Sequence, residues 1–276
     1  MRPGPQPFRP ATEADLHRLM RTLVGAGMFP DAVSVEAFWG VAPWRVQVTE
    51  RGDLALLERW RDHLPILGVE ALWCAERHIG PAMRQLHELA LRQGFDDLLS
   101  PPVPLEQAHA YESAGMRVTE DARTLTLDRV RRRAPVDAVA EGVSLRRATP
   151  ADMVALLETD IRCFDEFWRY DVRHFERYLR AQRLVVADGP GGVIGYTLST
   201  VAGDGVTLGR LAVVPECRRR GVGRALVEDV IGFAREQGAD RVTLCTQTEN
   251  AAALALYASA GFTDAGRRFV FLRFGA

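Results

Sequence analysis

The stretch PECRRRGVGRAL, residues 215–226, leads from a run of apolar, β-favouring residues into a segment with helical spacing. Arginines occupy positions 218–220, and Gly221 and Gly223 follow them. A glycine-rich turn between a strand and a helix points several backbone N–H groups in one direction, and the positive end of the helix dipole strengthens their attraction for an anion. The stretch therefore predicts an anion-binding loop, but it does not say which anion is bound.

The composition excludes several classes of anion-binding protein. The chain of 276 residues is 47% apolar, long enough for one large domain or two smaller ones, and its formal net charge is −1. A charge near zero gives no reason to expect nucleic acid or an anionic membrane as a partner. All 35 basic residues are arginines, whereas Walker A loops, protein kinases and pyridoxal enzymes each need a lysine. None of these three sites can be built from this chain.

The composition also gives expectations about location and metal binding. No segment reaches the roughly 18 uninterrupted apolar residues of a membrane span, and the N-terminus lacks the apolar core of a signal peptide. We therefore expect a cytoplasmic protein that does not bind membranes. The four cysteines form no Cys-x-x-Cys pair and the six histidines form no His-x-x-x-His pair, so we expect reduced thiols and no metal site.

Two sequence landmarks occur twice. FRPATEADL (8–16) returns as LRRATPADM (145–153), and AYESAGM (110–116) returns as LYASAGF (256–262). Each copy opens with a short strand and a threonine N-cap, Thr12 or Thr149, with an aspartate three residues later as a capping box. The repeat predicts a tandem arrangement of related modules at 11–129 and 143–276, joined by a charged linker at 130–142 and preceded by a proline-rich arm and edge strand at 1–10.

The second module has an α+β pattern. We expect strands at 183–187, 193–201, 206–214, 241–246 and 268–274, and helices at 150–157, 171–179, 222–237 and 251–260. These elements predict a mixed α+β sheet with helices on its faces, and we expect two such modules, each with a mostly antiparallel central sheet flanked by helices.

The glycine loop does not fit a dinucleotide fingerprint. That fingerprint needs Gly or Ala at its sixth position and an acidic residue at the end of the next strand, but this chain has Leu226 and a strand ending in LCTQTEN (244–250).

A second motif decides between the remaining anions. Asn250 follows a strand, Tyr257 comes two helical turns later on the same face, and Gly261-Phe262 ends the helix. The pattern Arg218-x-x-Gly221-x-Gly223 followed by Asn250-x-x-Ala253-x-x-x-Tyr257 resembles the GNAT acyltransferase superfamily. The motifs span residues 209–262, and the strand pattern extends the resemblance to 143–274.

The resemblance implies acetyl-CoA as co-substrate. It implies that the glycine loop binds the pyrophosphate, that the preceding strand hydrogen-bonds the pantetheine amides, and that Asn250 contacts the pantetheine. It also implies that Tyr257 acts as general acid toward the departing thiolate. The expected cofactor-binding residues are Leu211, Ala212, Val213, Arg218, Arg219, Arg220, Gly221, Val222, Gly223, Arg224, Asn250 and Ala253.

The general base is not assigned by the sequence. Some relatives carry a glutamate on the strand before the glycine loop, where this chain has Thr207 and Arg210, and others carry one on the next strand, where it has Cys245. Glu166 and Asp171 in CFDEFWRYD (163–171), which the resemblance places at the acceptor pocket, are candidates, and Glu166 is the residue we select. The amine could instead arrive neutral and need only positioning.

The first module has the landmarks without this chemistry. CAERHIGPAM (74–83) keeps Arg77 and Gly80, but Pro81 falls where Val222 lies and removes a backbone donor. Proline occupies position 104, seven residues before Tyr111, where the second module has asparagine. We therefore expect a degenerate module that packs against its partner, shapes the acceptor site or supports dimerisation, in a protein that is a monomer or homodimer.

Three functions remain open. The leading hypothesis is acetyl transfer from acetyl-CoA to a primary amine of a small molecule, by direct attack. A protein or peptide N-terminal acetyltransferase is the enzyme alternative, because residues 208–234 also resemble ribosomal-protein N-terminal acetyltransferases. A non-catalytic acyl-CoA sensor is an alternative of another class. Acceptor identity and acyl-chain length depend on loops with no transferable pattern.

Overall fold

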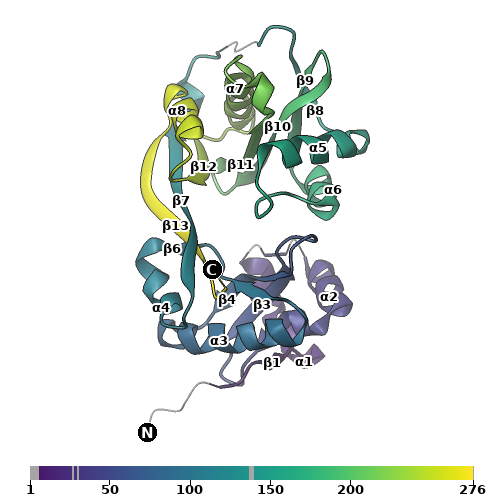
Figure 1. Ribbon diagram of the computed structural model, residues 1–276, viewed down its shortest axis with the longest axis vertical. Coiled ribbons are helices and arrows are strands. Elements are labelled where there is room, and N and C mark those ends of the chain that lie inside the picture. The colour runs from purple at the N-terminus through teal and green to yellow at the C-terminus, as the bar shows by residue number, and fades with distance from the viewer. Residues whose placement is uncertain (1–5, 27, 30, 137–139, 276) are drawn as a thin grey trace. The chain divides into compact units, whose positions relative to one another are not determined.

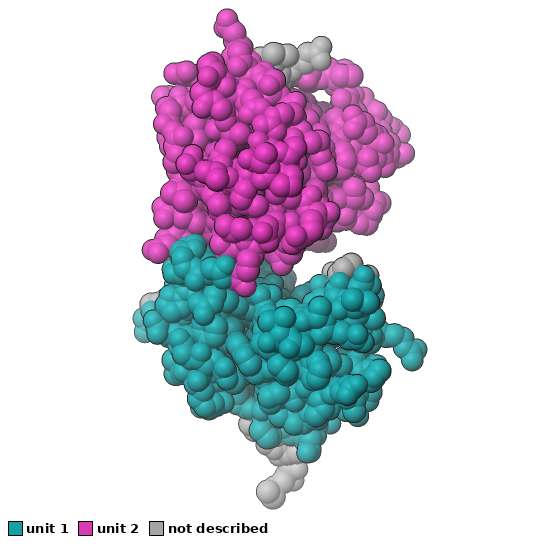
Figure 2. All heavy atoms as spheres, turned by 90° about the vertical axis from the view of Figure 1, so that its right-hand side faces the viewer, with its two compact units in different colours: residues 1–120, 270–276 teal, residues 121–269 magenta. Residues whose placement is uncertain are grey.

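The computed structural model describes residues 6–26, 28–29, 31–136 and 140–275 (Figure 1). Parts of two expected segments, residues 1–5 of the arm and 137–139 of the linker, lie outside this description. The chain forms two compact units, unit 1 from residues 1–120 and 270–276 and unit 2 from residues 121–269 (Figure 2). Across the described residues, no helix combines the length and the apolar character that a membrane crossing needs.

Unit 1 contains a mostly antiparallel sheet with helices packed on it. Strands β1 to β5 pair in sequence order, and only β4 and β5 run parallel. Its strands are β1 (Arg9–Pro10), β2 (Val46–Val48), β3 (Leu54–Arg59), β4 (Ile66–Trp73), β5 (Asp97–Leu99), β6 (Val103–Pro104) and the start of β7 (Arg117–Asp128). Its helices are α1 (Glu13–Gly25), α2 (Ala32–Val41), α3 (Glu76–Arg92) and α4 (Ala108–Glu112).

Unit 2 has the same plan in the order β13-β7-β12-β11-β10-β9-β8. Here β11 and β12 run parallel, whereas β8 to β11 and the pair β12 and β7 are antiparallel. Its further strands are β8 (Ser144–Arg147), β9 (Arg183–Gly189), β10 (Gly192–Ala202), β11 (Gly205–Val213), β12 (Arg241–Gln247) and β13 (Thr263–Arg273). Its helices are α5 (Met153–Cys163), α6 (Val172–Ala181), α7 (Val222–Glu236) and α8 (Ala251–Ser259). The expectation of two mixed modules with largely antiparallel sheets is confirmed.

The helices of unit 2 cover opposite faces of its sheet. Leu156 of α5 and Phe175 of α6 pack in one cluster with Val186 of β9, whereas Leu226 of α7 packs with the neighbouring Val185. Because successive side chains of a strand point to opposite faces, α5 and α6 lie on one face and α7 on the other. Helix α8 shares a cluster with α7.

Two strands pass from one unit to the other along the chain. Strand β7 begins in unit 1 and ends in unit 2, and β13 begins in unit 2 and ends in unit 1. Val270 and Leu272 near the C-terminus are fully buried in the core of unit 1, in a cluster with Leu98 of β5. The units therefore exchange their terminal strands. A division at the 130–142 linker would put residues 121–129 in the first module and 270–276 in the second, but residues 121–129 lie in unit 2 and residues 270–276 in unit 1. The repeated landmarks cannot reveal this exchange, because strand pairing is non-local.

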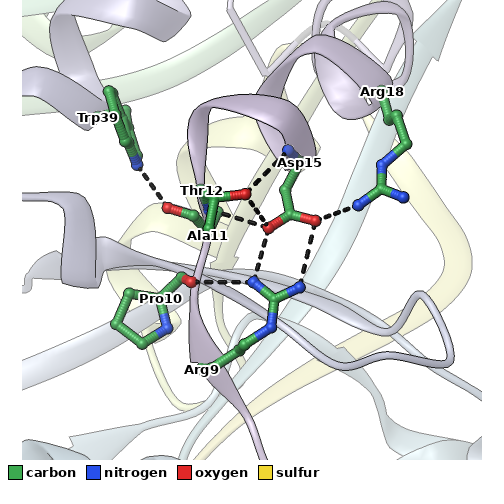
Figure 3. Close-up of polar contacts among 7 residues, drawn as sticks. All are labelled: Arg9, Pro10, Ala11, Thr12, Asp15, Arg18 and Trp39. Atoms are coloured by element: carbon green, nitrogen blue, oxygen red, sulfur yellow. Dashed lines mark hydrogen bonds and ion pairs between the residues drawn. The ribbon is translucent and has the colours of Figure 1, made fainter.

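The repeated N-terminal landmark of each module forms the same contacts. The Thr12 hydroxyl accepts from the Asp15 N–H, and the Asp15 carboxylate accepts from the Thr12 N–H at 2.9 Å, which closes a capping box (Figure 3). Arg9 adds an ion pair of 2.6 Å between its Nη1 and Asp15 Oδ2 (Figure 3). In the second copy Thr149 and Asp152 form the capping box, and Arg146 adds the ion pair, with Nη2 2.7 Å from Asp152 Oδ1. The internal repeat thus extends from sequence to side-chain geometry.

Some expected elements have different bounds. The helix expected at 150–157 begins as a 3₁₀ turn at Pro150–Asp152 and continues as α5 to Cys163. Thr159 and Asp160 in this extension are buried, so tertiary contacts stabilise a stretch in which the local apolar pattern is weak. The strand expected at 268–274 begins at Thr263.

Candidate active site

The site begins at an open edge of β11. Val206, Thr207 and Leu208 pair with residues 242–244 of β12, but from Gly209 onward the pairing described for β11 is with β10 alone. A bulge marks the change, because Ser199 of β10 faces Leu208 and the next residue along, Leu198, faces Arg210. The two parallel strands therefore separate beyond the bulge.

Backbone groups on the separated part of β11 point into this opening. The Val214 N–H donates to the Ile194 carbonyl of β10 at 3.0 Å. In an antiparallel ladder the direction of the backbone groups alternates along the strand, so those of Leu211 and Val213 face away from β10. They line the open edge and can pair with the amides of an extended ligand.

The predicted glycine loop follows β11 directly. Arg218 donates from Nε to the Val213 carbonyl at 3.0 Å, which fixes the loop to the strand end. Arg219 and Gly221 have positive φ angles of 60° and 83°, and α7 starts at Val222. Gly221 is the N-cap and offers no side chain to the first turn, so the N–H groups of residues 222–224 lack an intrahelical acceptor. These donors are available to an anion.

The arginines of the loop have different environments. Arg219 and Arg220 are exposed, whereas Arg224 is held by Glu228, with Nη2 2.7 Å from Oε1, and donates from Nη1 to the Ser259 carbonyl at 2.8 Å. Arg218 and Arg224 thus support the loop and the helix pair. The other two arginines have side chains that can reach a bound anion.

Helix α8 approaches α7 closely at Gly223. A Cβ built there would lie 3.1 Å from Leu256 Cδ2, a distance tighter than ordinary contact. Asn250 is the N-cap of α8, and its Oδ1 accepts from the Ala253 N–H at 3.1 Å. This contact occupies one side of the Asn250 amide and leaves its NH₂ group to donate to a ligand.

Tyr257 lies on the buried face of α8. Its side chain is 6% exposed, its ring is 5.7 Å from that of Phe262, and Leu211 of the open edge packs against the same cluster. Among the described residues the Tyr257 hydroxyl forms no hydrogen bond. The hydroxyl oxygen does not belong to the fully buried polar atoms that lack a partner, so it is not completely closed off from solvent. Burial raises the pKa of Tyr257 to about 12, so the phenol stays protonated at neutral pH.

The two candidate bases lie between α5 and α6. Glu166 is an exposed residue of the turn. Asp171 is the N-cap of α6 and accepts from the His174 N–H at 3.1 Å, and its Oδ1 lies 2.7 Å from His174 Nδ1. Asp171 is therefore engaged in capping and in a contact with the His174 ring, which makes it the weaker candidate.

Sequence reasoning missed a buried ionic cluster on the opposite face of β11. Arg210 pairs with Asp160 of α5, with Nη2 2.8 Å from Oδ1, and its Nε donates to the Tyr196 hydroxyl at 2.9 Å. Asp160 and Tyr196 are completely buried, and burial is the main cause that raises the pKa of Tyr196 well above its ordinary value. The signal was present: a buried arginine in an alternating strand requires an acid partner.

In the part of unit 1 that the structure describes, no glycine loop stands between β4 and α3. Only Cys74 and Ala75 separate β4 from α3, whereas residues 214–221 separate β11 from α7. Arg77, Gly80 and Pro81 therefore lie inside α3, and the expected alignment of Pro81 with the loop is corrected. Gly80 instead permits close helix packing, because a Cβ there would lie 2.6 Å from Ser113 Oγ.

The described residues contain no group of three or more His, Cys, Asp and Glu side chains placed to hold a metal ion. All four cysteines are free thiols.

In comparisons with known sequences, a family model matches part of unit 2. Residues 153–262 match the model described as "Acetyltransferase (GNAT) family". The chain is similar to the [ribosomal protein bS18]-alanine N-acetyltransferase of Escherichia coli, with 38% identity over 90 residues. This match covers 33% of the chain and 58% of that protein, so the chain spans a little over half the length of this relative.

Comparisons with solved structures extend the likeness to the fold of the whole chain. A tandem GNAT protein from the clavulanic acid biosynthesis pathway has a TM-score of 0.68 at 20% identity and matches 96% of this chain and 97% of its own. A GCN5-related N-acetyltransferase from Sphaerobacter thermophilus has a TM-score of 0.61 at 20% identity, over 96% and 94% of the two chains. Residues 153–262 therefore resemble the acetyltransferase (GNAT) family, and the chain as a whole has the fold of these solved structures.

Proposed function

We propose that this chain is an N-acetyltransferase that transfers the acetyl group of acetyl-CoA to a primary amine of a small molecule. The observation that carries the proposal is the open edge of β11 beside the uncapped start of α7 at Gly221. An extended chain of amides that ends in a pyrophosphate needs such a combination of a free strand edge and an anion site. The proposal includes a cytoplasmic location and a monomer or homodimer.

The residues present fit acetyl-CoA. The N–H groups of residues 222–224, with Arg219 and Arg220, supply donors and charge for the pyrophosphate. The backbone of Leu211 and Val213 would pair with the pantetheine amides, and the Asn250 amide would donate to the same arm. Bound acetyl-CoA supplies an acetyl group activated as a thioester.

Tyr257 is proposed to interact with the thioester sulfur. The reaction forms an amide C–N bond and breaks the C–S bond, so a proton must leave the amine nitrogen and one must reach the sulfur. A phenol with a pKa near 12 keeps its proton at neutral pH and can donate a hydrogen bond to the developing thiolate. Because a thiol has a pKa of about 8.5, complete proton transfer from Tyr257 alone is uphill, and the net proton comes from solvent or the attacking amine.

Glu166 is the proposed general base, acting directly or through water. Its exposed position in the turn between α5 and α6 allows it to reach solvent and to return the proton there. If the amine binds in its neutral form, Glu166 is unnecessary and positioning alone suffices.

A second acceptor class is supported by one comparison. The Escherichia coli relative is named for acetylating the alanine of a ribosomal protein, which favours a protein or peptide N-terminus as the alternative acceptor. A sensor that binds acyl-CoA without turnover is the alternative of another class.

Thiol release from acetyl-CoA tests these functions together. The protein is incubated with acetyl-CoA and either a panel of small amines or a panel of peptides with different N-terminal residues. Turnover with small amines supports the proposal, and turnover restricted to peptides replaces it with the alternative acceptor class. Binding of acetyl-CoA by calorimetry without release in either panel would identify a sensor, and no binding would refute all three.

A further inference from the structure

The buried ionic cluster of Arg210, Asp160 and Tyr196 joins β11, α5 and β10 to the loop between α5 and α6. Arg210 comes from β11, Asp160 from α5, and both contact the α5–α6 loop, residues 164–171. The Tyr170 N–H of this loop donates to Asp160 Oδ2 at 2.7 Å, and Arg210 donates from Nη2 to the Trp168 carbonyl at 2.8 Å. The loop is thus held through its backbone at two points.

Two aromatic rings of the same loop enclose the guanidinium. Arg210 Cζ lies 3.5 Å from the ring centroid of Phe164 and 3.8 Å from that of Tyr170. Such cation–π contacts strengthen when the cation is shielded from water, and Arg210 is only 8% exposed. The two ends of the loop are therefore fixed on one side chain of β11.

Arg210 lies beside the point where β11 separates from β12. It follows the bulge at Gly209 and precedes Leu211, the first residue whose backbone faces the open edge. The Arg210 side chain contacts the loop, whereas the side chain of the next residue, Leu211, packs on the opposite face of the strand.

We propose that Arg210 is a positioning residue, which fixes the α5–α6 loop beside the reacting end of β11 and so orders the acceptor-binding side of the site. This inference rests on the proposed function only in identifying this side of the site as the one that binds the acceptor. The planar guanidinium bonds a carboxylate, a hydroxyl and a carbonyl together while it stacks between two rings, and a lysine ammonium cannot satisfy all of these partners in one geometry.

Arg183 provides a matched control in the same unit. It forms a partly buried ion pair, with Nη2 2.9 Å from Asp229 Oδ1, and its Cζ lies 4.7 Å from the Phe233 ring centroid. Replacing it removes a similar set of contacts without affecting the loop. The variants are Arg210→Met, Arg210→Lys and Arg183→Met, each compared below its unfolding temperature.

Steady-state kinetics and hydrogen exchange are measured on each variant. Arg210→Met should raise the KM for the acceptor by about tenfold or more and leave the KM for acetyl-CoA within about twofold, because only the loop is displaced. Backbone amides of residues 164–171, above all Tyr170, should exchange faster. Arg210→Lys should give intermediate values, and Arg183→Met should lower stability with wild-type KM values and wild-type exchange in the loop.

The two readouts separate this inference from the proposed function. Wild-type acceptor KM and loop exchange in Arg210→Met, or equal changes in Arg183→Met, would overturn the positioning role while the enzyme stays active. If wild-type protein turns over no amine, the proposed function fails, and exchange alone decides: faster loop exchange in Arg210→Met supports the positioning role and unchanged exchange refutes it.

Discussion

At the scale of single residues, the two modules contain one pair of tyrosines in matching positions. Tyr257 and Tyr111 each lie in the repeated landmark, each is 6% exposed, and burial raises the pKa of both to about 12. Their intrinsic chemistry is therefore alike. Only Tyr257 shares a unit with a glycine loop, so the surroundings and not the side chain distinguish the proposed catalytic residue from a structural one.

Replacing Tyr257 by phenylalanine tests this distinction. Tyr257→Phe should lower kcat by about tenfold or more, because it removes the hydrogen bond to the leaving sulfur, and should leave the dissociation constant of acetyl-CoA within about twofold. Thiol release and calorimetry measure the two quantities. Tyr111→Phe is the control and should keep wild-type kcat. Equal kcat in the two variants would exclude Tyr257 as the hydrogen-bond donor to the leaving sulfur.

The capping aspartates predict an acid-sensitive contribution to stability. Ion pairs with Arg9 and Arg146 are the main cause that holds the pKa values of Asp15 and Asp152 far below their usual range. A depressed folded-state pKa stabilises the protein above the unfolded value near 4, and the contribution is lost as the pH falls below it. Asp15→Asn should cost about 1 kcal/mol at neutral pH through the weakened cap and should flatten the decline of stability between about pH 5 and 2. Urea unfolding across this range measures both, and an unchanged pH slope would contradict the assignment.

At the scale of elements, the start of α7 determines the anion site. Gly221 adopts a φ of 83°, which an L side chain rarely tolerates, and it leaves the first-turn N–H groups uncovered. Gly223 serves a different purpose, since it allows α8 to approach. Within one motif, Gly221 therefore shapes the loop and Gly223 allows the close packing of α7 and α8.

A pair of glycine substitutions in α7 separates loop conformation from helix stability. Gly221→Ala should weaken acetyl-CoA binding by about tenfold, because strain at this position reorients the donors. Gly232→Ala lies within the same helix, where a Cβ would meet only the far end of Arg235 at 3.9 Å, and should bind acetyl-CoA like wild type with equal or higher stability. Calorimetric titration compares them. Similar affinities would show that the loop does not hold the pyrophosphate.

At the scale of the whole molecule, the exchange of terminal strands makes unit 1 depend on the C-terminus. Leu272 is fully buried in the core of unit 1, and Arg273 pairs with buried Asp97 of β5, with Nε 2.8 Å from Oδ2. Unit 1 is therefore complete only when the last strand has been made.

Truncating Leu272 tests this dependence. Leu272→Ala should destabilise unit 1 by about 2–5 kcal/mol through lost burial and a residual cavity, whereas Val201→Ala at a 49% exposed site should change stability by less than about 0.5 kcal/mol. Tryptophan fluorescence during urea unfolding reports mainly on unit 1, which contains Trp39, Trp44, Trp60 and Trp73. Equal unfolding midpoints for the two variants would show that β13 does not support unit 1.

The sequence alone determined the local features. The two capping boxes and the glycine loop before α7 were predictable, because each depends on residues within one turn of each other. The doubled landmarks also predicted two related modules, since similar sequences favour similar local structure. The resemblance to the GNAT superfamily was inferred from the same short motifs, and residues 153–262 match its family model.

Tertiary structure decided what depends on distant residues. The separation of β11 from β12, the pairing of Arg210 with Asp160 and the exchange of β7 and β13 each join segments far apart in the chain. It also decided that Pro81 lies within a helix, because the length of the β4–α3 connection follows from where the strand finds its partner. Local propensity sets which elements form, whereas burial and strand pairing across the chain set where they end and which side chains they bring together.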